Sequence, residues 1–186
     1  MLLIAGLGNP GRVYEKTRHN AGAMLIDRLR ALYKAKLDTS GALSLYGRAV
    51  VAGREAILIK SRTYMNLSGD AVKEVSDSFS VPFESIIVAH DDCDLPLGRI
   101  RIRKGGGSGG HRGVASVIER LGTNAFPRVR LGIGRPAEGE LHGYVLSPFD
   151  PDEEGALDDM LKRATAAVEA IIKDGVGCAM NRFNAF

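Results

Sequence analysis

Short apolar runs alternate along the chain with longer segments of helical periodicity. The apolar runs, which predict strands, cover residues 2–5, 49–52, 56–60, 86–89, 99–104 and 129–133. The helical segments cover residues 20–36, 68–79 and 111–121, and a long one begins at Asp150-Pro151 and ends before Gly175. Strands interleaved with helices predict a single α/β domain over residues 1–186, with a mixed twisted sheet flanked by helices. In such a domain, functional residues lie on loops at the ends of strands.

Turn and cap residues define the ends of these elements. Asn20 and Ser68 are predicted as helix N-caps, because their side chains can accept hydrogen bonds from unpaired backbone N–H groups. Pro151 suits the first position of the last helix, and Gly175 suits the residue after its end. Residues 53–55 separate two apolar runs and predict a hairpin turn. The predicted buried stripe of the last helix is Leu157, Leu161, Ala164, Val168 and Ile172.

The composition is that of an ordinary globular protein, with 45% hydrophobic and 25% charged residues among 186. Residues 1–6 have no basic start, and their apolar stretch is too short for a signal peptide or a membrane span, so we expect no membrane partner. Cys93 and Cys178 do not form the framework of a secreted disulfide protein. We therefore expect reduced thiols and a cytoplasmic location. The sequence has no zipper pattern, and we expect a monomer.

The basic residues are concentrated in one part of the chain. Residues 99–135 carry a charge of +8, which leaves −5 for the rest of a chain whose net charge is +3. Arg101 and Arg103 alternate with isoleucines, so a strand would bury the isoleucines and present the arginines on its other face. Arg128 and Arg130 alternate with apolar residues in the same way. Such a face suits phosphate contacts and favours a nucleic-acid or polyphosphate partner over a plain solvated surface.

Three motifs match known functional patterns only in part. Residues 6–11 have the G-x-G-x-x-G spacing of a dinucleotide site, but Pro10 removes an N–H that a pyrophosphate needs. Asp27 also lies within a predicted helix and not at the end of a second strand. Residues 106–110 match G-x-S-x-G, yet the glycines around its serine predict a permissive loop instead of a strained nucleophile elbow. The ligand-rich residues 90–94 lack a second His/Cys pair at zinc spacing, so we expect no metal.

Four segments become specific when they are read together. They are residues 6–11 (GLGNPG), 17–20 (TRHN), 63–69 (TYMNLSG), and 90–92 (HDD) followed by 105–113 (GGGSGGHRG). In order, spacing and residue identity they resemble the bacterial peptidyl-tRNA hydrolase family, and the resemblance covers nearly the whole chain. Each motif alone is weak, but the complete set is specific. The resemblance implies cleavage of the ester that joins a peptide to tRNA, with tRNA as partner and no metal or organic cofactor.

The residues themselves support a hydrolytic site. His19 lies in a polar loop before a helix, and histidine has the pKa that best suits a general base near neutral pH. A base needs an orienting partner, and Asp91 at a strand end is the best candidate. Asn9 and Asn66 can donate and accept hydrogen bonds, although a turn or cap role would also explain asparagine there. The alternative, a non-catalytic RNA-binding module on the same fold, is disfavoured because His19, Asn9 and Asp91 are all present.

The resemblance also implies roles for particular residues. By this resemblance, His19 is similar to the catalytic base that activates water, Asp91 to the residue that stabilises it, and Asn9 to the residue that helps to distinguish peptidyl-tRNA from aminoacyl-tRNA. Positions that hold the substrate near the tRNA 3′ end are Tyr14, Tyr64 and Asn66, and basic positions that meet the tRNA backbone are Arg101, Arg103 and Arg130. The family usually has asparagine after the histidine of its glycine-rich loop, where this chain has Arg112. Arginine cannot accept a hydrogen bond, so Arg112 is expected either to contact a phosphate or to leave the pocket.

Overall fold

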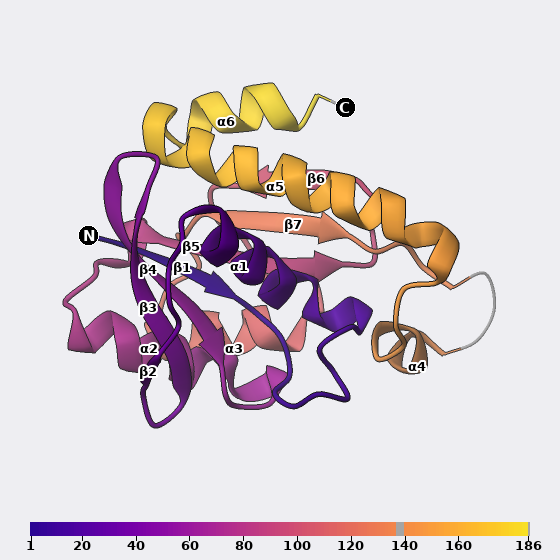
Figure 1. Ribbon diagram of the computed structural model, residues 1–186, viewed down its shortest axis with the longest axis horizontal. Helices are drawn as coiled ribbons and strands as arrows, with labels where there is room; N and C mark the ends of the chain where they lie inside the picture. The colour runs from indigo at the N-terminus through magenta and orange to yellow at the C-terminus, as the bar shows by residue number, and fades with distance from the viewer. Residues whose placement is uncertain (137–139, 186) are drawn as a thin grey trace.

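Helices cover both faces of the central strand β1 (Leu2–Gly6), so all of its residues are buried (Figure 1). The computed structural model describes residues 1–136 and 140–185 of the chain. The other strands are β2 (Thr39–Ser40), β3 (Ser44–Val51), β4 (Arg54–Ser61), β5 (Ile86–Asp92), β6 (Ile100–Arg103) and β7 (Arg128–Gly132). They form one seven-stranded sheet in the order β2-β3-β4-β1-β5-β7-β6.

The sheet is mixed, as the sequence predicts. Strand β1 pairs in parallel with β4 on one side and with β5 on the other, and β5 pairs in parallel with β7. The outer strands β2, β3 and β6 each join an antiparallel neighbour. The carboxyl ends of four neighbouring strands therefore meet at the same edge of the sheet, which is where ligands bind in folds of this kind.

Six α-helices and four short 3-10 turns are present among the described residues. The helices are α1 (Ala21–Leu32), α2 (Ser68–Ser78), α3 (Arg112–Leu121), α4 (Leu141–Val145), α5 (Glu154–Asp174) and α6 (Val176–Phe183). The 3-10 turns are η1 (Arg18–Asn20), η2 (Met65–Leu67), η3 (Phe83–Ser85) and η4 (Pro151–Glu153). None of the helices within the described ranges combines the length and the hydrophobicity that a membrane crossing needs.

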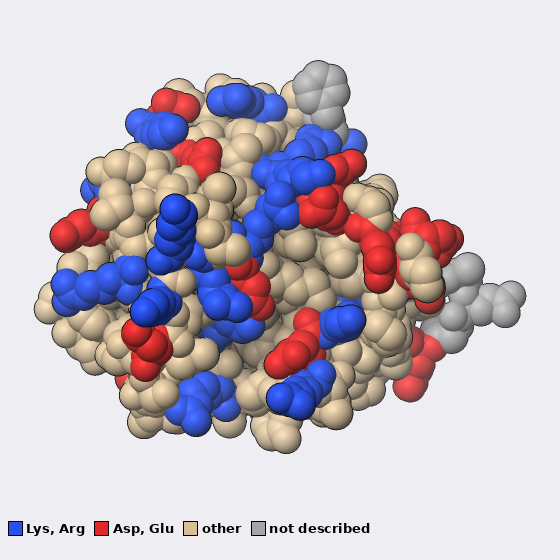
Figure 2. Space-filling model, in the orientation of Figure 1, with Lys and Arg blue, Asp and Glu red and all other residues tan. Residues whose placement is uncertain are grey.

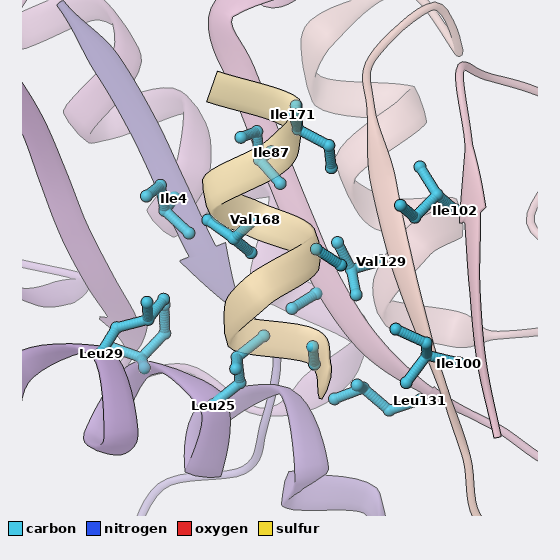
Figure 3. Close-up of a cluster of buried hydrophobic side chains, with 14 of the residues drawn as sticks. Ile4, Leu25, Leu29, Ile87, Ile100, Ile102, Val129, Leu131, Val168 and Ile171 are labelled. Atoms are coloured by element: carbon cyan, nitrogen blue, oxygen red, sulfur yellow. The ribbon is translucent and has the colours of Figure 1, made fainter. Parts of the chain in front are cut away.

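Two hydrophobic cores lie on opposite faces of the sheet. Alternate residues of β1 point to opposite faces, so Ile4 belongs to one core and Leu3 to the other. The first core packs the sheet against α1, α5 and α6, and Figure 3 shows Val168 of α5 above the strands with Ile87 nearby. The second core packs the other face against α2 and α3, with Val72 among its buried residues. The sheet is thus a rigid platform enclosed on both sides.

Asn20 occupies the predicted N-cap position of α1, but its side chain makes no cap hydrogen bond, and Ser68 is the first residue of α2 and not its N-cap. The amide of Asn20 accepts the backbone N–H of Asn9 and donates to the backbone carbonyl of Asn9, both at 2.9 Å. The Ser68 hydroxyl lies 3.8 Å from the sulfur of Met65 and makes no cap bond. The predicted start at Asp150-Pro151 corresponds to η4, which leads directly into α5, and Asp150 forms a capping box with Glu153 there.

Several element bounds also differ from the prediction. The hairpin turn lies at residues 52–53, because β4 begins at Arg54 and not at residue 56. Strand β5 continues to Asp92, which places its last three polar residues within the sheet and not in a loop. Helices α4 and α6 were not predicted. In the stripe of α5, Leu157 and Leu161 are only partly buried, whereas the other three predicted residues are buried.

A close approach of backbones brings the start of α1 against the strand ends. Gly22 lies where an added Cβ would overlap the Ala89 carbonyl oxygen and would come within 2.8 Å of the Leu7 backbone nitrogen. The Leu7 N–H donates to the Ala89 carbonyl at 2.9 Å, and the Ala23 N–H donates to the Leu7 carbonyl at 3.0 Å. This contact fixes the position of η1, the turn directly before α1, relative to the end of β5.

Gly22→Ala is expected to lower the free energy of unfolding by about 1–3 kcal/mol, because the added methyl group overpacks this contact. The sign is opposite to the usual gain when alanine replaces a helical glycine. Thermal unfolding followed by circular dichroism measures it, with a shift of roughly 2–4 °C for each kcal/mol. Gly155→Ala is the matched control, since Gly155 is in α5 with open space around it and should gain stability. Equal melting temperatures for the two variants would contradict the packing argument.

Candidate active site

A cleft of about 870 Å³ opens at the edge of the sheet where β5 and β7 end. Nine of the ten residues that the sequence predicts for the site line this cleft. They are Asn9, Tyr14, His19, Tyr64, Asn66, Asp91, Arg103, Arg112 and Arg130. The tenth, Arg101, is exposed on β6 and is not among the residues that line the cleft. Residues widely separated in sequence are therefore brought together as predicted.

His19 and Asp91 form a hydrogen-bonded pair at the base of the cleft. His19 comes from η1 and Asp91 from β5, and the Nδ1 atom of His19 lies 2.9 Å from both carboxylate oxygens. Burial opposes ionisation of Asp91, but the charges and hydrogen bonds of His111 and His19 outweigh it and hold the pKa of Asp91 well below its usual range. Because a carboxylate can only accept, Nδ1 of His19 carries the proton. Its Nε2 atom then keeps a free lone pair.

His111 is a second histidine on the same carboxylate. It precedes α3 as the N-cap, and its Nδ1 atom accepts the backbone N–H groups of Gly113 and Val114 at 3.1 and 3.2 Å. The proton of the neutral ring must therefore be on Nε2, which donates to the Oδ1 atom of Asp91 at 2.9 Å. The helix start fixes the tautomer of His111, and the tautomer fixes the direction of its bond to Asp91.

The side chains of His19, Asp91 and His111 also have the composition of a metal site. One ligand atom of each lies within 4.8 Å of the others. A metal ion would need the lone pair of the His111 Nε2 atom, and that atom carries the proton because Nδ1 accepts two backbone N–H groups. With this hydrogen-bond pattern, His111 supports Asp91 as a donor and does not suit metal coordination.

Asn9 is held rigidly in the wall of the cleft. Its Oδ1 atom accepts the backbone N–H of Met65 at 2.8 Å, and Asn20 binds both of its backbone polar groups. This arrangement commits the side-chain oxygen and leaves the Nδ2 group to donate to a ligand. Tyr64 and Asn66, which flank Met65, also line the cleft. The contact with Met65 thus ties two of the motif segments to each other.

Sequence reasoning missed a role for His90. It is buried and neutral, because burial and the nearby His111 lower the pKa of His90 from 6.5 to about 3. Its Nδ1–H donates to the backbone carbonyl of Asp91 at 2.7 Å, and its ring lies 4.8 Å from the ring of His111. The run His90-Asp91-Asp92 carries a signal for this cluster, but the sequence assigns a role only to Asp91.

Arg18, the neighbour of His19, was also missed. Its side chain is 3% exposed and lies 2.5 Å from the carboxylate of Glu153, the last residue of η4. The guanidinium lies over the rings of Tyr144 and Phe149, 4.3 and 4.9 Å from their centroids. The buried cation thus fastens the turn that carries His19 to α4, whose residues line the cleft. Sequence spacing gives no sign of this contact, since its partners are more than 120 residues away.

The predicted arginine face is only partly correct. Arg128 is buried, with 4% of its surface exposed, and donates to the Gly107 carbonyl instead of facing solvent. Arg130 pairs with Asp92, and Arg135 pairs with Asp94. Basic and acidic side chains are interspersed on the face shown in Figure 2, and acidic ones gather over the start of α5. A single broad basic face is therefore not present on that side.

The match to a known family covers almost the entire chain. A family model described as peptidyl-tRNA hydrolase matches residues 3–186. The chain belongs to the peptidyl-tRNA hydrolase family. A peptidyl-tRNA hydrolase of Clostridium novyi is 43% identical over 186 residues, which is 100% of this chain and 99% of the relative. The peptidyl-tRNA hydrolase of Carboxydothermus hydrogenoformans is 45% identical and is matched over 98% of its length.

A solved structure supports the same fold. The crystal structure of peptidyl-tRNA hydrolase from Acinetobacter baumannii has a TM-score of 0.93 with this chain at 36% identity. The match covers 100% of this chain and 95% of that one. The predicted α/β fold and the resemblance to the peptidyl-tRNA hydrolase family are confirmed.

His90→Asn is expected to weaken the loss of stability in acid. In the unfolded chain His90 takes up a proton below its ordinary pKa of 6.5, whereas in the folded protein its pKa is about 3. Between these two values the unfolded state binds more protons, so the free energy of unfolding falls as the pH falls. One such group contributes a slope of about 1.4 kcal/mol per pH unit. Asparagine does not titrate and can still donate to the Asp91 carbonyl. Urea unfolding between pH 7 and roughly pH 4.5 measures the slope.

The matched control for this experiment is His142→Asn, which changes an exposed histidine of α4. The His90 variant should lose less stability than wild type and the control across the window. Identical slopes for all three proteins would show that His90 is not buried in its neutral form.

Proposed function

We propose that this protein hydrolyses the ester bond of peptidyl-tRNA, with His19 as the general base. The observation that carries the proposal is the hydrogen bond of the His19 Nδ1 atom to the buried, ionised Asp91. It leaves the Nε2 lone pair available in a cleft that contains the other motif residues. Histidine in this state removes protons efficiently near neutral pH.

The proposed reaction is attack of water on the ester carbonyl. His19 takes a proton from the water as its oxygen bonds to the carbonyl carbon, and Asp91 stabilises the resulting imidazolium. The developing oxyanion is stabilised by donors such as the Asn66 amide or the N–H groups of residues 105–110. The bond between the carbonyl carbon and the ribose oxygen then breaks, and His19 returns its proton to that oxygen. The products are free peptide and free tRNA, which recycles tRNA from aborted translation.

The substrate contacts follow the position of each residue around the cleft. Asn9 presents its Nδ2 donors and is proposed to distinguish peptidyl-tRNA from aminoacyl-tRNA. Tyr14, Tyr64 and Asn66 are proposed to hold the 3′ end of the tRNA. Arg103 and Arg112 are proposed as phosphate contacts, because neither forms an ion pair with the residues that the structure describes. Arg130 would have to exchange Asp92 for a phosphate, and Arg101 would meet tRNA outside the cleft.

We infer that the protein acts as a monomer in the cytoplasm. The outer strand β6 is covered where the Asn184 amide accepts the Ile102 N–H at 2.7 Å and donates to its carbonyl at 3.0 Å. An edge satisfied in this way is a poor template for a second copy of the sheet. Cys93 and Cys178 are both free thiols, which agrees with a reducing compartment.

His19→Ala is expected to reduce kcat by about 10²- to 10⁴-fold, because the water loses its base. Binding of tRNA should change little, since the phosphate contacts remain. Release of the amino acid from N-blocked aminoacyl-tRNA measures turnover, and a filter-binding assay measures tRNA affinity. Asp91→Asn should also lose activity, because an amide can donate to Nδ1 and favour the wrong tautomer. Full activity of the His19 variant would exclude the proposed mechanism.

Affinity for tRNA is expected to fall steeply as the salt concentration rises, since phosphate contacts release counterions. Arg103→Met should reduce the slope of log Kd against log salt by about 0.7–0.9 if it removes one phosphate contact. Arg163→Met, which changes an exposed arginine of α5, is the control and should leave the slope unchanged. A slope that is the same for all three proteins would mean that Arg103 does not meet a phosphate.

A further inference from the structure

We propose that Arg128 is a positioning residue that holds the glycine-rich loop, residues 105–110, and through it the hydrogen bonds of the catalytic pair. The proposal rests on the proposed function, because its main readout is turnover. Arg128 comes from the first position of β7, beneath a wall of the cleft that the loop forms. The nearby arginines of β6 and β7 are proposed tRNA contacts, but Arg128 itself is buried.

The environment of Arg128 is unusual for a cation. The residue is 4% exposed, and its Nε–H is buried without a hydrogen-bond partner. No carboxylate among residues 1–136 and 140–185 forms an ion pair with it. Burial and the charges of Arg130 and Arg103 lower the pKa of Arg128. A buried charge without an opposite charge opposes folding, so an arginine in this environment points to a functional requirement.

The bond that Arg128 does make is to the loop. Its Nη1 atom donates to the Gly107 carbonyl at 2.7 Å. The loop is held at two other places, since the Gly106 N–H donates to the Asn124 carbonyl at 3.2 Å and the His111 N–H donates to the Ser108 carbonyl at 3.1 Å. Arg128 therefore supplies the central tie between the two ends of the loop.

The loop leads directly to the catalytic pair. Ser108, next to Gly107, binds the backbone of His111, and the ring of His111 donates to Asp91 at 2.9 Å. Asp91 in turn holds His19 at 2.9 Å. Each step from Arg128 to the base is thus a hydrogen bond or a single chain link. A shift of the loop would move His111 and weaken the bond that fixes the carboxylate.

Gly106 shows how closely the loop and the cation fit. Its φ angle is +121°, which favours glycine, and an added Cβ would lie 3.1 Å from the Nη2 atom of Arg128. Gly107, by contrast, has open space around it. The backbone of the loop therefore packs closely against the guanidinium beside the hydrogen bond to Gly107. This geometry suits a residue that supports the loop better than one that binds a phosphate.

The test compares Arg128→Met and Arg128→Lys with wild type. Methionine fills similar space without a donor, whereas lysine keeps a donor that can approach the Gly107 carbonyl. The methionine variant is expected to lose kcat on the order of 10²-fold, as for a misplaced catalytic group, and the lysine variant should recover part of it. The slope of log Kd for tRNA against log salt should stay at the wild-type value. The melting temperature of the methionine variant should be equal to or above that of wild type, because an uncompensated buried charge is removed.

Other results would overturn the proposal. A salt slope that falls by about 0.7–0.9 with kcat intact would make Arg128 a phosphate contact. A melting temperature several degrees lower, with activity lost only in proportion to unfolding, would make it a structural residue. Unchanged kcat in the methionine variant would show that the loop does not need the tie. Arg163→Met controls for loss of a surface arginine. Failure of the wild-type protein to hydrolyse N-blocked aminoacyl-tRNA would instead contradict the proposed function.

Discussion

The site depends on one buried carboxylate that accepts hydrogen bonds from two histidines. Asp91 is 2% exposed, and an unsolvated charge there would oppose folding. The hydrogen bonds from His19 and His111 replace those that water would make to this carboxylate. The same bonds fix the tautomer of each ring, so one carboxylate determines which nitrogen of His19 is free. The same hydrogen bonds therefore stabilise the buried charge and set the protonation pattern of the site.

Three parts of the fold converge to satisfy that constraint. Strand β5 extends far enough to bring Asp91 to the end of the sheet, and α1 begins against it because Gly22 allows the backbones to meet. The start of α3 faces the same point, with His111 as its cap. Each element is anchored in a hydrophobic core, so the distances among the polar groups are maintained by apolar packing. The cleft is precise because the platform beneath it is rigid.

Much of this arrangement could be predicted from the sequence, and the limits have a physical cause. Periodicity predicts the strands and long helices because the sheet is covered on both faces, and the motifs bring His19, Asn9 and Asp91 together. Asn20 was expected to cap a helix because local propensity favours that role, but a partner eleven residues away uses its amide. Arg128 follows the same alternation as an exposed residue and is nevertheless buried. Alternation of polar and apolar residues shows which side chains share a face of the sheet, but it does not show which segment covers that face.

The wall of the cleft depends on residue 20 being an amide. One side chain both accepts from and donates to the backbone of Asn9, and only an amide offers both groups in that geometry. Spontaneous deamidation would convert it to a carboxylate, which would keep the acceptor but set a negative charge against the Asn9 carbonyl. The wall that presents the Asn9 side chain would then be repelled from its support. Exchange of one amide for a carboxylate would thus disturb the wall that presents Asn9 and leave the bond between His19 and Asp91 in place.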